Sequence, residues 1–215
     1  MALQRREFVS AVAGALAVSV AGPSARTVQS DDRVPATVLF QGDSITDADR
    51  DRNNAAPNVA SALGRGYPYL IAAAELAEHP RSQLRFLNRG VSGNKIPDLA
   101  ERWDADTLAL APDVLSVLMG VNDFWHRLLQ GYTGTVEDYE RGYVALLDSA
   151  RARNPRLRIV VLEPFVLRTG AVDARWFPEF DERRAAAARV ARAAHATFIP
   201  LQAMFDRLVR AAPPA

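Results

Sequence analysis

A serine follows directly after an apolar run near the start of the chain. Residues 38–46 read Val-Leu-Phe-Gln-Gly-Asp-Ser-Ile-Thr, so Ser44 lies in a small polar turn after that run. In open α/β folds such a turn raises a hydroxyl above the carboxyl edge of a parallel sheet, where reactive groups gather. Ser44 is therefore a candidate nucleophile. A nucleophilic serine also needs a base, and donors for the oxygen that becomes negative.

Two more polar segments follow two later apolar runs. Residues 88–94 read Asn-Arg-Gly-Val-Ser-Gly-Asn, and residues 120–123 read Gly-Val-Asn-Asp. The backbone N–H groups of Ser44 and Gly93, with the side-chain amide of Asn122, could supply three donors to an oxyanion. Each segment alone is typical of an ordinary turn or a helix cap. Their occurrence in order, at three successive strand ends, favours an acyl-transfer site.

The remaining pattern predicts the elements that hold these segments. Apolar runs without polar alternation indicate strands that are covered on both faces, and helical patterns separate them. The expected strands are 36–40, 84–88, 114–119, 159–163 and 197–200; the expected helices are 68–77, 97–110, 136–153, 179–194 and 201–211. Strands that alternate with helices predict an α/β fold, a three-layer α/β/α sandwich with a five-stranded parallel sheet. The segments 47–66 and 165–178 are expected to be loops at the edge that carries Ser44.

Composition excludes several classes of protein. Hydrophobic residues make up 49% and charged residues 24% of the 215 residues, which is ordinary for a soluble domain. The formal net charge is +1 and the arginines are scattered, so nucleic-acid binding is not expected. Cysteine is absent, which excludes disulfides and thiolate metal sites. No histidine and acid cluster has metal-ligand spacing, and nothing indicates the oligomeric state.

The N-terminal residues resemble a targeting signal rather than part of the fold. The pair Arg5-Arg6 precedes an uncharged run rich in Ala and Val, and small residues follow. This order is typical of an export signal of the twin-arginine type, which we assign to residues 1–25. A membrane anchor is the alternative, but the apolar run is short for a span. We expect an exported protein, periplasmic or secreted, with a domain over 34–215 and no stable membrane span after cleavage.

The three polar segments together resemble the blocks of the GDSL or SGNH hydrolase family. Gly42-Asp43-Ser44-Ile45 corresponds to the first block, Gly93 to the second, and Gly120-Val121-Asn122-Asp123 to the third. The resemblance covers residues 37–205, and within the family it is strongest to bacterial esterases that remove acetyl groups from sugars, such as acetylxylan esterases. It implies a flavodoxin-like fold and ester hydrolysis without metal or cofactor. It also implies a nucleophilic Ser44, an oxyanion hole of Ser44, Gly93 and Asn122, and supporting roles for Asp43 and Asp123.

The sequence departs from the family in its base. The family carries Asp-x-x-His near the C-terminus, and this chain reaches Ala215 without it. We expect a truncated form that lacks the last loop and helix, with natural loss of the base as the alternative, and in either case an esterase that is slow or inactive. Residues 123–126 match the pattern Asp-x-x-His, but Asp123 belongs to the third block. His126 is therefore a candidate base only because it fits that pattern. His79 and His195 are expected to be surface or structural residues.

The substrate expected from the resemblance is a small-molecule or carbohydrate ester. Trp125, Trp176 and Phe177 could offer flat surfaces to a sugar ring, whereas Trp103 is expected to pack in the core. Three alternatives stay open: an inactive carbohydrate-binding homologue, a general short-chain esterase, and an esterase of the lysophospholipase type.

Overall fold

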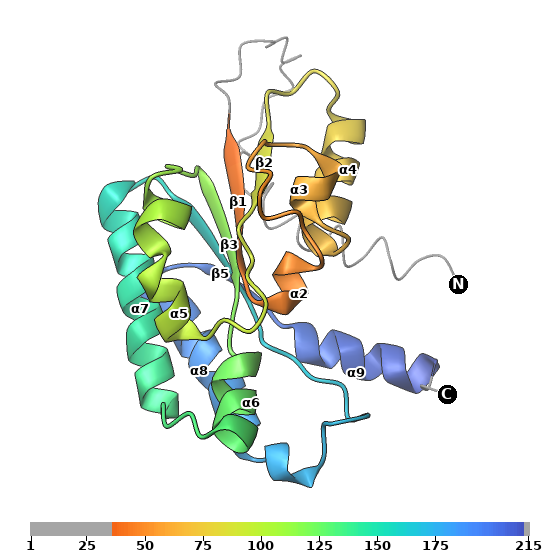
Figure 1. Cartoon of the computed structure of the whole chain (residues 1–215), viewed down its shortest axis with the longest axis vertical. Coiled ribbons are helices and arrows are strands. Elements are labelled where there is room, and N and C mark those ends of the chain that lie inside the picture. The colour runs from red at the N-terminus through yellow and green to blue at the C-terminus, as the bar shows by residue number, and fades with distance from the viewer. Residues whose placement is uncertain (1–35, 213–215) are drawn as a thin grey trace, which may run out of the picture.

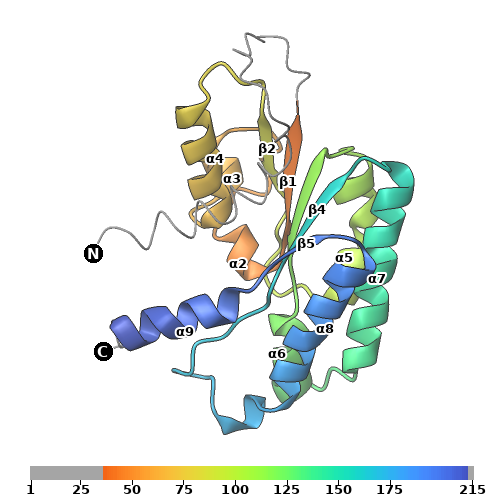
Figure 2. The ribbon, with the colours of Figure 1, turned by 180° about the vertical axis from the view of Figure 1, so that it is seen from behind.

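The computed structural model describes residues 36–212 and contains a parallel sheet between two layers of helices (Figures 1 and 2). The strand order is β2-β1-β3-β4-β5, and every neighbouring pair is parallel. The strands are β1 (Thr37–Gly42), β2 (Arg85–Asn88), β3 (Val114–Leu118), β4 (Arg158–Leu162) and β5 (Thr197–Ile199). The predicted fold class is confirmed.

Neighbouring side chains of each strand enter different hydrophobic clusters, because side chains alternate between the two faces of a sheet. On β1, Leu39 enters one cluster, while Val38 and Phe40 enter the other. The same alternation holds for β3 and β4. Both faces are therefore apolar, which explains why the strand runs show no polar alternation in the sequence.

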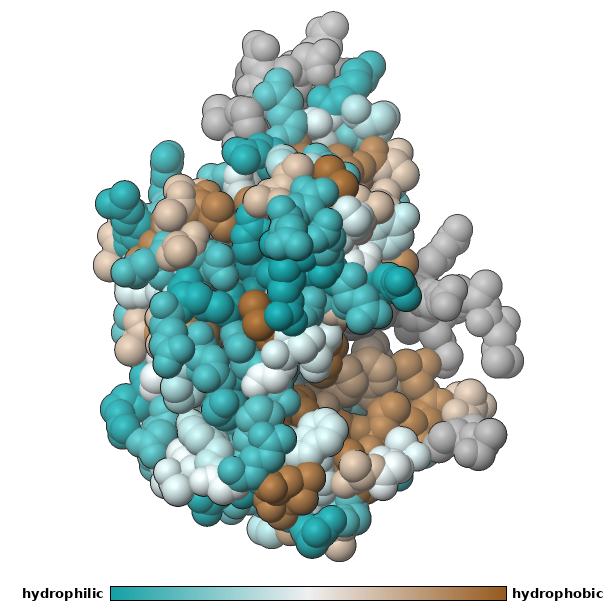
Figure 3. Space-filling view, viewed as in Figure 1, coloured by the Kyte–Doolittle hydropathy of each residue, from teal (hydrophilic) through white to brown (hydrophobic). Residues whose placement is uncertain are grey.

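Two groups of helices cover these faces. The first cluster is covered by α5 (Ile96–Glu101), the π-helical turn η1 (Asp104–Leu108), α7 (Val136–Arg153) and α8 (Glu179–Ala193). The second is covered by α3 (Ala60–Leu63), α4 (Tyr67–Glu78) and α9 (Leu201–Ala211). Helix α9 extends away from the sheet, and Figure 3 shows apolar surface where it lies. Two more helices, α2 (Ser44–Asp47) and α6 (Val121–Gln130), follow β1 and β3 directly.

The expected helices agree with these bounds except at one place. The helix predicted over 97–110 is wrong as a single element, because the chain ends α5 at Glu101 and continues through η1. The helix over 136–153 has the bounds of α7, and its Thr135 and Asp138 form a capping box. The two expected loops contain short helical elements, α3 in the first and η2 (Ala174–Trp176) in the second.

Two predictions lie outside the described residues. The export signal assigned to 1–25 precedes residue 36, and an Asp-x-x-His element after Ala215 would follow the described part. Between residues 36 and 212, no helix has the length and apolar character that a membrane crossing requires.

Candidate active site

The register of the strands places the three polar segments at the same edge of the sheet. Phe40 pairs with Asn88 and Gly42 pairs with Leu118, so β1, β2 and β3 end side by side. The N–H of Val91 then donates to the Gly42 carbonyl at 3.0 Å, which joins the second segment to the first. The carboxyl ends of the first three strands thus meet at one edge of the sheet, as the sequence predicts.

Ser44 is the first residue of the short helix α2 and its side chain is exposed. The preceding residue, Asp43, caps this helix by accepting a hydrogen bond from the N–H of Ile45 at 3.0 Å. Close packing holds the helix against the second segment: a Cβ at Gly90 would lie 2.4 Å from the backbone nitrogen of Asp47. Among the described residues, none hydrogen-bonds to the Ser44 hydroxyl, so it is open to a substrate.

Three donors near Ser44 have hydrogens that no described residue accepts. The backbone N–H groups of Ser44 and Gly93 make no hydrogen bond within residues 36–212. Gly93 has φ +84°, and a Cβ added there would meet nothing within 4 Å, so this loop faces open space. The side-chain amide of Asn122 donates one hydrogen to the Asn94 carbonyl at 3.2 Å, which leaves the other free. The buried Asn122 is thereby fixed beside the second segment.

Two buried carboxyl groups lie directly beside these residues. Burial, with a smaller contribution from the charge of Asp123, raises the pKa of Asp43 from 3.8 to about 7. Burial likewise raises the pKa of Asp123 from 3.8 to about 6, although the N–H of Ile96 donates to it at 3.0 Å. Each has one oxygen without a hydrogen-bond partner among the described residues. Each carboxyl residue is 1% exposed, so both lie in the interior next to the site and neither faces solvent.

No described histidine contacts Ser44. His79 follows α4 and precedes β2, and His195 follows α8 and precedes β5, so both lie toward the opposite edge of the sheet. His126 lies on α6, one turn after Asn122, and its Nδ1 is 3.5 Å from Lys95 Nζ. Burial and the Lys95 charge lower the pKa of His126, which keeps the ring neutral near pH 7. The structure therefore brings His126 to the margin of the site but not to the serine.

The three candidate aromatic residues differ in exposure. Trp125 is 38% exposed on α6, whereas Trp176 is 1% exposed and packs against Phe124 and Phe180. The assignment of Trp176 to a substrate pocket is wrong, because its ring lies in the core behind Trp125. Its Nε1–H donates a hydrogen bond to the Ala171 carbonyl. Phe177 is half-buried and lies under the guanidinium of Arg168. Trp103 is 3% exposed, so its expected place in the core is confirmed.

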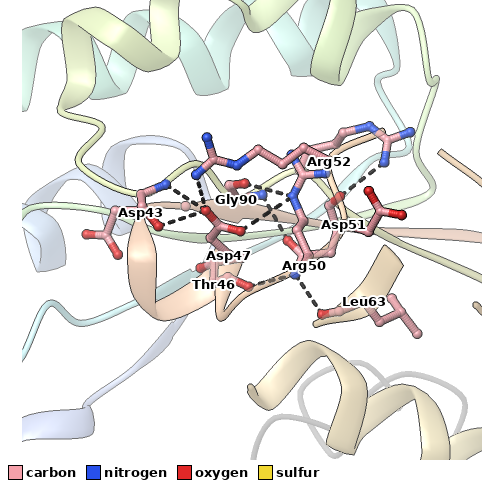
Figure 4. A network of polar contacts seen from close by, with 12 residues as sticks. Asp43, Thr46, Asp47, Arg50, Asp51, Arg52, Leu63 and Gly90 are labelled. Carbon is pink, nitrogen blue, oxygen red and sulfur yellow. Dashed lines mark hydrogen bonds and ion pairs between the residues drawn. The ribbon is translucent and has the colours of Figure 1, made fainter. Parts of the chain in front are cut away.

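A polar network beneath the site was not predicted from the sequence. Asp47, on α2, accepts hydrogen bonds from the backbone N–H of Ser92 at 2.9 Å and from its hydroxyl at 2.7 Å. Figure 4 shows its pairing with Arg52. On the other side of the second segment, Arg102 donates to the Asn94 side chain at 2.6 Å and to the Gly42 carbonyl at 3.3 Å. The contacts of Asp47 with Ser92 and of Arg102 with Gly42 join residues 45 and 60 apart in the sequence, so no local pattern indicates them.

Residues 36–212 hold no group of three or more His, Cys, Asp or Glu side chains that could bind a metal ion. The site instead combines an exposed hydroxyl with three unused donors at the end of a parallel sheet. That arrangement fits the class of serine hydrolases built on an open parallel α/β sheet.

Comparison with known proteins gives the family. Residues 40–214 match the GDSL-like Lipase/Acylhydrolase family. The chain belongs to this family and is a carboxylic ester hydrolase by that membership.

The relatives include an esterase of known substrate. An acetylxylan esterase of Geobacillus stearothermophilus is 30% identical over 180 residues, which cover 83% of this chain and 81% of the esterase. A crystal structure from Parabacteroides merdae, described as a GDSL-like lipase, is 46% identical with a TM-score of 0.80 and covers 83% of both chains.

The solved acetylxylan esterase Axe2 of G. stearothermophilus has a TM-score of 0.71 at 26% identity, with 81% of this chain and 80% of Axe2 covered. Two further Axe2 structures are of catalytic mutants, in which an aspartate or a histidine is replaced by alanine.

Proposed function

We propose that the protein removes acetyl groups from carbohydrate esters, with Ser44 as nucleophile. The main support is that the exposed Ser44 hydroxyl lies at the same strand edge as three donor groups, each with a hydrogen that no described residue accepts. The acetylxylan esterase relatives support the acetyl-sugar substrate. Export through residues 1–25 would suit a substrate that is part of an extracellular polymer.

The chemistry begins with attack of Ser44 Oγ on the ester carbonyl carbon, while a base takes the hydroxyl proton. The carbonyl oxygen becomes negative and accepts hydrogen bonds from the N–H groups of Ser44 and Gly93 and from the free amide hydrogen of Asn122. Collapse of this intermediate breaks the bond to the sugar oxygen, which takes up a proton. Water then hydrolyses the acetyl ester on Ser44, releasing acetate and restoring the hydroxyl.

The lack of a base in contact with Ser44 limits the rate of ester hydrolysis that the described residues can support. Because none of the three histidines contacts Ser44 in residues 36–212, we expect the 215-residue chain to hydrolyse esters slowly. When a triad member is missing, the oxyanion hole and binding alone still give about 10³–10⁴-fold acceleration over water. An Asp-x-x-His element supplied by chain beyond residue 215 would remove this limit.

The exposed Trp125 offers a surface for a sugar ring beside the site. It lies three residues after Asn122 on α6, so both side chains are on neighbouring parts of the same helix face. The ring of Trp176 packs against it from the core at 6.0 Å between centroids, which fixes its orientation. Phe177 is more enclosed and contributes less surface.

The test compares acetate release by the unmodified chain, by Ser44→Ala and by the control Ser82→Ala. Ser82 lies between α4 and β2, away from the candidate site, and its hydroxyl has no partner among the described residues. With p-nitrophenyl acetate and acetylated xylo-oligosaccharide, we expect slow release that Ser44→Ala abolishes and Ser82→Ala leaves unchanged. Turnover at ordinary enzyme rates would show that the base is present in this chain after all.

Three other outcomes separate the alternative functions. Binding of the acetylated oligosaccharide without any acetate release would favour a non-catalytic carbohydrate-binding homologue. Ser44-dependent release from p-nitrophenyl acetate but not from the oligosaccharide would favour a general short-chain esterase. Preference for a lysophospholipid would favour the third alternative.

A further inference from the structure

The loop that carries Gly93 has little support of its own. Gly93 has a left-handed φ of +84°, and nothing lies within 4 Å of where its Cβ would be. Its N–H makes no hydrogen bond to a described residue. The direction of that N–H must therefore be set by the residues on either side, Ser92 and Asn94, since the two peptide planes that meet at Gly93 belong partly to them.

Ser92 is held by a carboxylate of the nucleophile's own helix. Asp47 lies three residues after Ser44, and one of its oxygens accepts from both the N–H and the hydroxyl of Ser92, at 2.9 and 2.7 Å. These two bonds fix the backbone nitrogen and the side-chain rotamer of Ser92 together. The Asp47 side chain is 4% exposed, so its carboxylate is largely shielded from water although Ser92 itself is exposed.

The charge of Asp47 is maintained despite this burial. Burial by itself raises the pKa of Asp47, but hydrogen bonds from Arg52 and Ser92 lower it more, and the net pKa is below the ordinary value of 3.8. The carboxylate is thus an acceptor with no proton of its own at neutral pH. Hydrogen bonds to an ionised acceptor are stronger than those between neutral groups.

Asn94 is held from the other side by an arginine. Arg102 Nε donates to Asn94 Oδ1 at 2.6 Å, while its Nη1 donates to Gln41 Oε1 at 2.9 Å and to the Arg89 carbonyl at 2.7 Å. The Asn94 carbonyl in turn accepts the Asn122 amide at 3.2 Å. One guanidinium therefore connects the ends of β1 and β2 to the residue that orients Asn122.

We propose that Asp47 and Arg102 form a clamp on the two neighbours of Gly93 and act as positioning residues of the oxyanion hole. The clamp rests on the proposed function, because it acts only through the donors of Gly93 and Asn122. Asp47 couples the position of the Gly93 N–H to the helix that starts at Ser44. Arg102 couples it to the Asn122 amide.

The experiment removes the contact between Asp47 and Ser92 by substituting each of the two residues in turn. Asp47→Asn keeps the shape of the side chain but removes the charge, and Ser92→Ala removes the hydroxyl donor from an exposed residue. Ser92→Thr restores a hydroxyl at the same place. Asp49→Asn is the matched control, because Asp49 lies just after the same helix, with a side chain that is 79% exposed and a φ of +59° that asparagine also adopts.

We expect the variants to lower kcat for p-nitrophenyl acetate while KM changes less than about twofold, because the oxyanion donors act mainly in the transition state. Asp47→Asn should lower kcat by about tenfold or more and Ser92→Ala by about fivefold, since complete loss of an oxyanion donor costs about 10²–10³-fold. Ser92→Thr should restore most of the activity, and Asp49→Asn should equal the unmodified chain. Thermal unfolding of each variant checks that the fold is retained.

A second measurement does not depend on turnover. In ¹⁵N NMR spectra, the Gly93 amide resonance should shift or broaden in Asp47→Asn and Ser92→Ala, and it should stay in place in Asp49→Asn. An unchanged Gly93 resonance, or equal kcat for Ser92→Ala and the unmodified chain, would overturn the clamp. If Ser44→Ala has the same turnover as the unmodified chain, the proposed function fails, and the Gly93 resonance still decides whether the clamp exists.

Discussion

The two faces of the sheet are covered in different ways. On one face, α7 and α8 lie side by side and bury a continuous apolar surface (Figure 2). On the other, α9 buries only its first two residues, Leu201 and Gln202, and then extends outward with half-buried apolar side chains. The first face is held by packing along two whole helices. On the second face, the part under α9 depends on what fastens the start of that helix, whereas α3 and α4 cover the rest.

Polar contacts provide that fastening. Glu163, just after β4, accepts the N–H of Gln202 with one oxygen at 2.8 Å and the guanidinium of Arg184 with the other. The Gln202 side chain also bonds the N–H and carbonyl of Val166, at 3.0 and 2.9 Å. One carboxylate thus connects α8 on the first face to α9 on the second. The loss of apolar volume should therefore be costly on one face, and the loss of a polar contact on the other.

The largest effect is expected in the packed face. Leu147→Ala, on α7, removes a side chain with no exposed surface and leaves a cavity between the helix and the sheet. We expect a loss of about 3 kcal/mol of unfolding free energy, within the range for buried leucines. Urea titration followed by circular dichroism measures it, and a loss below that of the α9 variant described last would contradict the comparison.

An intermediate effect is expected at the connection between the faces. Glu163→Gln keeps the shape but replaces one acceptor oxygen by a donor and removes one of the two carboxylate partners of Arg184, the other being Asp181. We expect a loss of about 2 kcal/mol, typical of hydrogen bonds to charged groups. Hydrogen exchange should become faster in α9 and stay slow in α7. Uniform acceleration in both helices would show that Glu163 does not fasten α9 in particular.

The smallest effect is expected on α9 itself. Phe205 stacks on Phe165 with 3.9 Å between ring centroids, but the ring is only partly buried. Phe205→Ala should lower the free energy of unfolding by about 1 kcal/mol, because the partly buried ring removes only a small apolar area from water. The same urea titration compares the loss of unfolding free energy with that of Leu147→Ala. Equal losses would contradict the difference between the two faces.

Much of the fold could be predicted from the sequence. Uniformly apolar strands and long helices with clear stop signals, such as Asn154-Pro155, specify the sheet and its order of elements. The helices α2 and α6 were missed because each starts within a polar segment whose residues were already interpreted as a turn. The break after Glu101 was missed because it depends on tertiary contacts, among them the inward turn of Arg102.

The site could be predicted in part. Ser44, Gly93 and Asn122 fall at strand ends, and the register of a parallel sheet brings strand ends together whatever lies between them. Asp47 and Arg102 gave no signal of their role, because Asp47 reaches Ser92 across 45 residues of sequence and Arg102 reaches Gln41 across 61. The burial of Trp176 could not be read from its loop position either, since a loop can fold its aromatic residues inward.

The buried Asp43 has a consequence for the proton balance of folding. Its pKa is 3.8 when exposed and about 7 in the folded protein, so at pH 7 the folded chain keeps a share of a proton that the unfolded chain releases. The stabilisation from this proton is complete below about pH 4 and is lost as the pH rises through about 7. Unfolding near neutral pH should release protons, and its measured heat should change with the ionisation enthalpy of the buffer.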